Sequence, residues 1–298
     1  MNDLSYAIGL DVGGTSLKSA LVSSDGSAYM NLHTSINSQG SKEDLIKTFI
    51  YALNRHLKTA DDHGLRVCGI GIGMPGPFDY KRGVCLIPPH LHKFQALYGL
   101  NIREELAERT GLDNILFEND ARTFLLGEEW MGLARGFRRI IGITLGTGMG
   151  SSFMVDGRIV SMGKGIPRSG WIGGMKCDWG IAEDRISQRW ILHRYQELTN
   201  KSAENVEQIA KNCDAACIEV FEELGRTIGY VLLPIAQRFE ADCIVFGGQI
   251  SKSFQLFEKP LREKLRFSSV KLLGRAEHID LSPMIGAAKL IFLRERLI

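Results

Sequence analysis

Two glycine-threonine loops are the first candidates for chemistry in this sequence. One is "LDVGGTSLK", which follows an apolar run ending on Asp11, and the other is "LGTGMG", which begins at Leu145. Glycines let the backbone approach an anion closely, so the N–H groups of such loops can bind phosphate. Neither loop has the Gly-Lys-Ser/Thr ending of a Walker A motif, and each alone is more typical of a β-turn. Together they predict two loops that bind the phosphates of one nucleotide. Asp11 is placed to bind Mg²⁺ directly or through water.

The stretch "FENDAR" supplies a candidate general base. Asp120 follows an apolar run and precedes an amphipathic stretch, so it stands where a strand gives way to a helix. One interpretation is that Asp120 only caps that helix, which is a frequent use of aspartate. The other is that its carboxylate accepts a proton from a substrate hydroxyl during phosphoryl transfer.

Two further turns could line a binding site. "GMPGPFD" contains Gly76 in a glycine-proline turn, and "IVFGGQIS" contains Gly247 and Gly248 between a strand and a helix. The second turn leaves room for a flat base or a ribose against the backbone. Each is equally a tight connection between elements.

The elements that must position these residues alternate between strands and helices. Residues 6–30 predict strand, loop, strand, turn and strand, and residues 140–160 predict the same series. Residues 41–64 predict a helix with Ser41 at its N-cap, and residues 101–111 a short helix capped by Asn101. Further strands are expected in the stretches 66–76, 114–120 and 243–248, and further helices at about 121–132, 214–239, 251–266 and from about 283.

The two loop-containing stretches repeat one another. Gly14-Thr15 and Gly146-Thr147 are 132 positions apart, and the turns Asp25-Gly26 and Asp156-Gly157 are 131 apart. Similar hairpins are common, but this spacing is close to half of the chain. It favours two related α/β domains around a cleft. We expect the first domain to comprise residues 1–120 with the helix at 284–298, and the second to comprise 121–283.

Composition excludes several classes of protein. The 298 residues carry a formal net charge of +2, with 44% hydrophobic and 23% charged residues, so no nucleic-acid or membrane partner is expected. No apolar run reaches transmembrane length, and the first residues do not resemble a signal peptide. The six cysteines are scattered through the chain, which favours reduced thiols and a cytoplasmic location.

Taken together, these motifs resemble the ROK family of sugar kinases and repressors, within the actin/hexokinase/Hsp70 superfamily. The matching segments are "IGLDVGGTSLKSALV", "GIGMPGPFD", "FENDAR", "ITLGTGMGSSFMVDGRIV", "IVFGGQIS" and "IGAAKL". They run in the family's order through nearly the whole chain. The resemblance implies two RNase-H-like (actin-like ATPase) α/β domains around a central cleft, and transfer of the ATP γ-phosphate to a hexose hydroxyl, usually the 6-hydroxyl.

The resemblance also implies a role for each matching residue. Asp120 would be the general base, with Asn119 and Gly76 at the sugar. Asp11 would bind Mg²⁺. The residues implied in nucleotide binding are Asp11, Gly13, Gly14, Thr15, Lys18, Gly146, Thr147, Gly148, Gly247 and Gly248.

The sequence departs from the family on the sugar side. The family's Gly-Glu-x-Gly-His, whose His also binds zinc, is replaced by "GWIGG", so that Trp171 stands for the Glu and Gly174 for the His. The cysteine stretch that follows is shortened, and it retains Cys177 and Glu183, the latter at a sugar-binding Glu. A structural zinc needs four N or S ligands, so no zinc is expected. Cys213 and Cys217 lie at helix spacing and are interpreted as small packing residues.

Two substitutions leave alternatives open. Trp171 could stack on a sugar or donate its indole N–H to it, or it could simply fill the space left by the missing zinc. The family's Asn-Leu-Pro-Gly-Trp is replaced by "HLHKF", with His90 at the Asn position. His90 could line the sugar pocket or be an ordinary surface histidine.

The sequence therefore predicts an ATP- and Mg²⁺-dependent sugar kinase of the hexokinase/glucokinase type, with an unusual acceptor such as an amino sugar, a ketose or a glycoside. The alternative is a catalytically weak protein that senses a sugar or a nucleotide. An actin-like filament protein would leave "FENDAR" unexplained. The first loop strand begins by about Tyr6, which leaves no room for a repressor's helix-turn-helix. A homodimer is expected because the family is usually dimeric.

Overall fold

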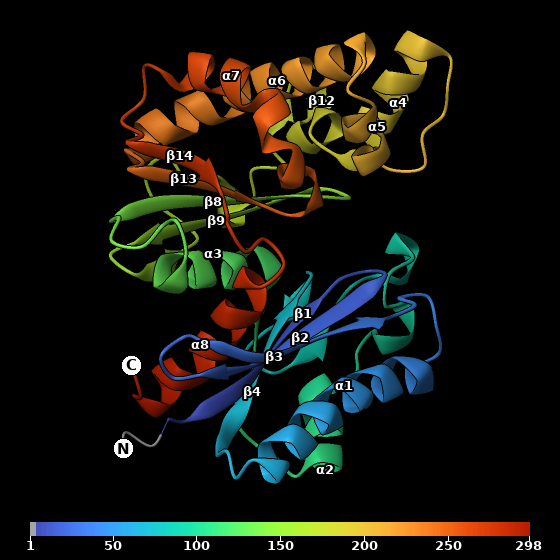
Figure 1. Cartoon of the computed structure of the whole chain (residues 1–298), viewed down its shortest axis with the longest axis vertical. Helices are drawn as coiled ribbons and strands as arrows, with labels where there is room; N and C mark the ends of the chain where they lie inside the picture. The colour runs from blue at the N-terminus through green and yellow to red at the C-terminus, as the bar shows by residue number, and fades with distance from the viewer. Residues whose placement is uncertain (1–3) are drawn as a thin grey trace. The chain divides into compact units, whose positions relative to one another are not determined.

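The chain has a mixed α/β fold (Figure 1). The computed structural model describes residues 4–298. Contacts divide these residues into two compact units, one running to Met131 and resuming at Asp280–Ile298, the other comprising Gly132–Ile279. Helix α3 (Asp120–Met131) lies in the first unit, where it packs against α8 (Ser282–Glu295). The domain boundary expected after residue 120 thus coincides with the start of a helix of this unit.

The first unit is built on a five-stranded sheet with the order β3-β2-β1-β4-β7. Its strands are β1 (Tyr6–Val12), β2 (Ser16–Ser23), β3 (Ala28–Ser35), β4 (Val67–Met74) and β7 (Ile115–Asn119), with a small hairpin of β5 (Phe78–Asp79) and β6 (Val84–Cys85). Strands β1, β2 and β3 pair antiparallel, whereas β4 and β7 run parallel to β1. The expected series of strand, loop, strand, turn and strand is confirmed.

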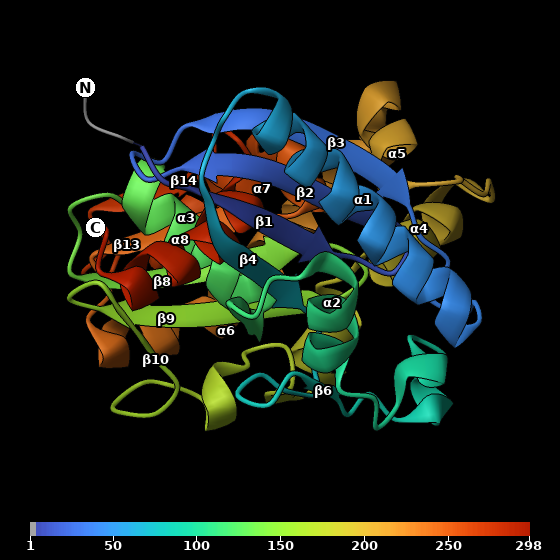
Figure 2. The same ribbon diagram turned by 90° about the horizontal axis from the view of Figure 1, so that it is seen from below.

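Helices cover both faces of this sheet. On one face, α1 (Lys42–Asp62) and α2 (Ile102–Thr110) bury a core around Phe49 and Phe94. On the other face α8 packs against β1 and β4 (Figure 2). Gly286 on α8 allows this helix to lie close to α3, because a Cβ built at this position would be 1.8 Å from the Thr123 carbonyl oxygen.

The second unit is built on a five-stranded sheet with the order β10-β9-β8-β13-β14. Its strands are β8 (Arg139–Leu145), β9 (Met149–Val155), β10 (Arg158–Val160), β13 (Cys243–Gly247) and β14 (Leu272–Arg275), with a small hairpin of β11 (Lys176–Cys177) and β12 (Gly180–Ile181). Its helices are α4 (Gln188–Thr199), α5 (Val206–Asn212), α6 (Ala215–Phe239) and α7 (Phe254–Leu265). Helices α6 and α7 pack together along the sheet, as Figure 1 shows.

The two sheets have the same topology. In each, three antiparallel strands in hairpin order are followed by two parallel strands added next to the first. The repeat of Gly14-Thr15 at Gly146-Thr147 therefore reflects a repeated architecture, because both loops join the first two strands of their sheets.

Local capping fixes where several helices begin. The Ser41 hydroxyl accepts the Asp44 N–H at 3.2 Å, and the Asn101 side chain accepts the Glu104 N–H at 3.4 Å, so both expected caps are confirmed. Asp214 similarly caps α6, accepting the Cys217 N–H at 2.7 Å. Helices α4 and α5 were not expected, although Asn205 caps α5 in the ordinary way.

In residues 4–298, no helix combines the length and the apolar character needed to cross a membrane.

Candidate active site

Asp11, Asn119 and Asp120 meet at one edge of the first sheet. Strands β1, β4 and β7 are parallel neighbours, so their carboxyl ends lie side by side. Asp11 is in register with Gly73, and Met74 with Asn119. Ligands bind at such an edge in many α/β folds, because strand ends supply polar groups from several segments.

The Asp120 carboxylate is held at the start of α3. Oδ1 accepts the Ala121 N–H at 2.9 Å at the start of α3, and Asn119 Oδ1 accepts the same N–H at 3.1 Å. Both side chains thus contact the first amide after Asp120. Burial raises the pKa of the Asp120 carboxyl, while the Ala121 N–H and the charge of Lys93 oppose that rise. A carboxylate of raised pKa at the edge of a sheet has the properties of a general base.

Asp11 lies in the same electrostatic environment. Burial raises its pKa to about 7, and the neighbouring charge of Asp120 adds to the rise, while Lys18 opposes it. Lys18 is paired with Asp11 across β1 and β2, so the two side chains share a face of the sheet. A cation beside Asp11 would offset the cost of ionising it, so the carboxylates present fit a bound Mg²⁺.

Lys18 does not project freely from β2. Its Nζ forms an ion pair with Asp280 Oδ1 at 2.5 Å, just before α8 begins. The two residues are 262 positions apart, which is why the sequence pointed to Lys18 and not to Asp280. Asp280 also contributes to the raised pKa of Asp11.

In the first glycine loop, two carbonyl groups accept backbone hydrogen bonds, and two amides have no hydrogen-bond acceptor. The Gly14 carbonyl accepts the Ser38 N–H, and the Thr15 carbonyl accepts the Ile36 N–H, both at 3.2 Å. Gly13 N–H donates to the Ser16 carbonyl at 2.8 Å. Within residues 4–298 no acceptor bonds the amides of Gly14 and Thr15, so these remain available for an anion.

Tyr80 is a site neighbour that the sequence did not indicate. Its hydroxyl donates to the Met74 carbonyl at 3.1 Å and accepts the Asn119 side-chain amide at 3.3 Å. A Cβ built on Gly76 would lie 3.1 Å from this hydroxyl. Tyr80 thus links the turn after β4 to the end of β7, and burial raises its pKa, which keeps it protonated.

The segment "HLHKF" begins with an exposed short helix, η1 (Pro89–Leu91). His90 is exposed there and forms no hydrogen bond within the described residues. Lys93, which the sequence interpretation passed over, is partly buried, and a Cβ built on Gly14 would lie 3.2 Å from its Cε. The segment therefore brings Lys93, and not His90, to the first glycine loop.

The second glycine loop is held by Glu183. The Glu183 carboxylate accepts the Met149 N–H at 2.8 Å, and a Cβ built on Gly148 would lie 2.2 Å from its Oε2. Only glycine leaves room for this contact. Gly146 is bonded through its carbonyl to the Gln188 N–H at 2.9 Å, while the amides of Thr147 and Gly148 have no acceptor within residues 4–298.

Trp171 also forms a hydrogen bond with Met149. Its indole N–H donates to the Met149 carbonyl at 3.1 Å, so Glu183 and Trp171 hold both polar groups of Met149. A Cβ built on Gly174 would lie 2.4 Å from the Trp171 ring, so the tryptophan occupies the space that a side chain at 174 would need. The side chain nevertheless remains 49% exposed.

The turn at Gly247-Gly248 lies next to the second loop. Gly248 has a φ of 80°, and a Cβ built on it would lie 2.3 Å from the Leu145 carbonyl oxygen, immediately before Gly146. The Ser251 hydroxyl donates to the Gly247 carbonyl at 2.6 Å and fixes the turn. Gly146, Thr147, Gly148, Gly247 and Gly248 are thus neighbours in the second unit, as Gly13, Gly14, Thr15, Asp11 and Asp120 are in the first.

The residues present do not fit a structural zinc. Across residues 4–298, no three His, Cys, Asp or Glu side chains are grouped as metal ligands. Cys177 Sγ contacts the Met175 carbonyl oxygen at 3.7 Å, and no histidine accompanies it in the shortened stretch. The absence of zinc stays a prediction about the protein in solution.

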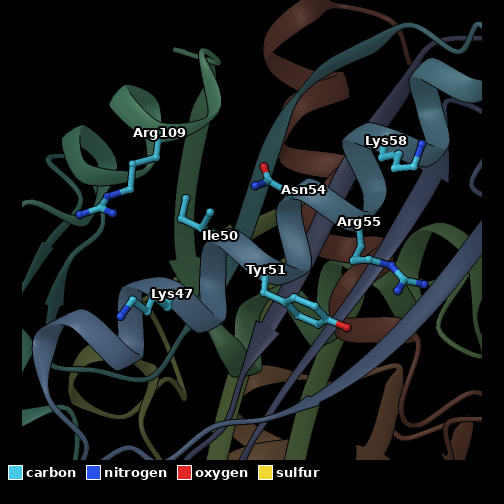
Figure 3. Close-up of a pocket in the computed structure, with 7 residues that line it drawn as sticks. All are labelled: Lys47, Ile50, Tyr51, Asn54, Arg55, Lys58 and Arg109. Atoms are coloured by element: carbon cyan, nitrogen blue, oxygen red, sulfur yellow. The ribbon is translucent and has the colours of Figure 1, made fainter.

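A surface hollow of about 390 Å³ lies apart from these residues (Figure 3). It is lined by α1 and α2 side chains, namely Lys47, Ile50, Tyr51, Asn54, Arg55, Lys58 and Arg109. Several of these cations already pair with neighbouring acids such as Glu43, Asp62 and Glu105. The hollow has no carboxylate base and no glycine loop, and it is best described as a solvated helix surface.

Comparison with known proteins gives a family match over almost the whole chain. The model of the ROK family matches residues 7–293. A glucokinase of Thermotoga maritima is 27% identical over 282 residues, covering 87% of this chain and 86% of that protein. A xylose repressor of Caldicellulosiruptor bescii is 23% identical over 286 residues, covering 88% of this chain and 70% of that protein.

Solved structures show the same fold. A ROK family glucokinase from Streptomyces griseus, determined with glucose and AMPPNP, superposes with a TM-score of 0.76 at 22% identity. The match covers 96% of this chain and 99% of that one. The α/β fold is therefore that of the actin-like ATPases, as the sequence motifs predicted.

Proposed function

The chain belongs to the ROK family, and we propose that it is a sugar kinase that transfers the γ-phosphate of ATP to a hydroxyl of a hexose or hexose derivative, preferably the 6-hydroxyl. The observation that carries this proposal is the pairing of a base with a phosphate loop in one unit. Asp120, a carboxyl group of raised pKa, lies at the same sheet edge as Asp11 and the free amides of Gly14 and Thr15. A protein that only bound nucleotide would have no use for the base.

Each residue in this proposal has a distinct task. Asp120 accepts the proton of the attacking hydroxyl, and the Asn119 amide, held by Tyr80, orients the sugar. The amides of the two glycine loops bind the phosphates of ATP. Gly247 and Gly248 border the adenosine, and Glu183 and Trp171 support the second loop.

Magnesium fits the acidic edge of the first sheet. Bound Mg²⁺ supplies positive charge that offsets the negative charge of the phosphates. Asp11 is the residue that would hold it, directly or through water. Because the pKa of Asp11 is about 7 in the absence of a cation, a bound cation would favour the ionised form of this carboxylate. Lys18 would reach a phosphate only after leaving Asp280.

The same proposal also covers the class of sugar, the two domains and the oligomeric state. The family's sugar-binding Glu and His are replaced by Trp171 and Gly174, so an acceptor other than plain glucose is favoured: an amino sugar, a ketose or a glycoside. We take the two compact units as the two domains of the kinase, and a cytoplasmic homodimer without zinc as its working form.

A panel assay tests this function. Release of ADP would be measured with ATP, Mg²⁺ and each of a set of hexoses, amino sugars, ketoses and glycosides. We expect at least one sugar to stimulate ADP release and chelation of Mg²⁺ to abolish it. If sugars or ATP bind by calorimetry while none stimulates ADP release, the second candidate, a sugar- or nucleotide-sensing protein, replaces the first. That candidate is favoured by the loss of polar sugar contacts at Trp171 and Gly174.

A further inference from the structure

We propose that Lys93 is a catalytic residue that binds the phosphoryl group during its transfer, an inference that rests on the kinase function proposed above. Lys93 occupies the fourth position of "HLHKF", where the related family segment Asn-Leu-Pro-Gly-Trp has glycine. The side chain at this position is therefore a cation, where the resemblance to the family implies a glycine.

Lys93 is close to the first glycine loop. A Cβ built on Gly14 would lie 3.2 Å from Lys93 Cε and 3.9 Å from its Nζ. No carboxylate in residues 4–298 forms an ion pair with this ammonium group, although it contributes to the electrostatic environment of Asp120. One unpaired cation therefore lies beside a loop with free amides, and its charge acts on Asp120.

The backbone around Lys93 fixes its position. His92 and Phe94 have φ values of 51° and 50°, so non-glycine residues adopt the left-handed conformation on both sides of Lys93. Such residues persist only where the surroundings hold them. Phe94 is fully buried, and its N–H donates to the Ser38 carbonyl at 2.6 Å. Ser38 N–H in turn donates to the Gly14 carbonyl at 3.2 Å, so a continuous backbone link connects Lys93 to the loop.

The place of the transferred group follows from the chemistry. The sugar hydroxyl must lie at Asp120, and the donor phosphates must lie at the glycine loop, so the γ-phosphorus passes between them. A bond forms between the sugar oxygen and this phosphorus, the bond from the phosphorus to the bridging oxygen of ADP breaks, and the proton goes to Asp120. The ammonium group of Lys93 offsets the negative charge on the phosphoryl oxygens, a role that positioned cations fill in other kinases.

Nucleotide affinity provides a test that does not depend on turnover. The dissociation constants of ATP and ADP would be measured by calorimetry for the wild type, Lys93→Met, Lys93→Arg and the control Lys58→Met, an exposed lysine of α1. We expect Lys93→Met to weaken ATP binding about 10-fold or more while ADP binding changes little, because only ATP has the γ-phosphate. Retained ADP binding also shows that the variant folds.

Turnover supplies the second readout. With a sugar that the wild type phosphorylates, kcat of Lys93→Met should fall about 100-fold, and Lys93→Arg should recover part of that loss. Equal effects on ATP and ADP affinity, or none on either, would overturn the role of Lys93. If the wild type phosphorylates no sugar, the kinase proposal fails, and the difference between ATP and ADP still decides whether Lys93 contacts the γ-phosphate.

Discussion

The charge on Asp11 depends on what lies beside it. Burial and the nearby Asp120 raise its pKa to about 7, against an ordinary value of 3.8. The folded protein without a cation therefore binds this proton more tightly than the unfolded chain. The resulting contribution to stability is complete below pH 3.8 and is lost as the pH rises through 7.

Replacing Asp11 should for that reason stabilise the protein that lacks a metal. We expect Asp11→Asn to raise the free energy of unfolding by about 1–2 kcal/mol at pH 8 and by less at pH 5. Urea denaturation in the presence of EDTA measures both values. Asp113→Asn, at an exposed position, serves as the control and should change stability little at either pH. A destabilised Asp11→Asn protein at pH 8 would contradict the account.

Short stretches of sequence were sufficient to indicate much of the candidate site. Asp11, Asp120 and the glycine loops are recognisable because each belongs to one local pattern of strand, loop and helix. Asp280 and Lys93 could not be found in this way, since their contacts depend on the fold. Lys18 and Asp280 meet across 262 positions, and Lys93 reaches Gly14 only through a backbone link that includes Ser38.

At the scale of elements, the connection between β8 and β9 is supported by the irregular segment that follows β10. Trp171 and Glu183 each hold one polar group of Met149, the first residue of β9. Sequence reasoning identified both residues and left open whether Trp171 stacks on a sugar or only packs. In the structure the Trp171 indole N–H donates to the Met149 carbonyl, and the side chain is partly exposed.

Two variants at Trp171 separate these roles. Trp171→Phe removes the hydrogen bond but retains an aromatic ring, whereas Trp171→Ala removes both. If Trp171 supports the phosphate loop, both variants should raise KM for ATP several-fold, since one lost hydrogen bond amounts to about 1 kcal/mol. If it mainly stacks on the sugar, only Trp171→Ala should raise KM for the sugar.

Steady-state kinetics with ATP and the sugar varied in turn would measure both KM values. Trp179→Phe is a matched control, because the Trp179 N–H donates to the Ile181 carbonyl at the same 3.1 Å without contacting the loop. An unchanged KM for ATP in both Trp171 variants would exclude the supporting role.

The packing of α8 against α3 depends on Gly286. A Cβ there would be 1.8 Å from the Thr123 carbonyl oxygen, so the helices would have to separate. We expect Gly286→Val to lower the free energy of unfolding by about 3 kcal/mol or more, as overpacking against rigid backbone does. Thermal or urea unfolding measures this, with Leu293→Ala, at a partly exposed position of α8, as the control. A stability within 1 kcal/mol of the wild type would show that the helices can separate at little cost.

At the scale of the whole molecule, the chain is a repeated structure with unequal halves. Both sheets have the same strand order and both carry a glycine-threonine loop after the first strand. Only the first unit has the acids Asp11 and Asp120, and only the second has the Trp171-Glu183 contacts. The repeat was visible in the sequence because glycine and threonine recur at the turns, whereas α4 and α5 lie outside the repeat and were not predicted.

Transfer of labelled phosphate to the sugar tests whether Asp120 is the general base of a sugar kinase. ATP labelled at the γ-phosphate would be incubated with Mg²⁺ and the sugar that best stimulates ADP release, using the wild type, Asp120→Asn and the control Asp113→Asn. We expect label to move to the sugar with the wild type and Asp113→Asn, and at least about 100-fold more slowly with Asp120→Asn. Label that appears only as inorganic phosphate, or that reaches the sugar equally fast with Asp120→Asn, would contradict it.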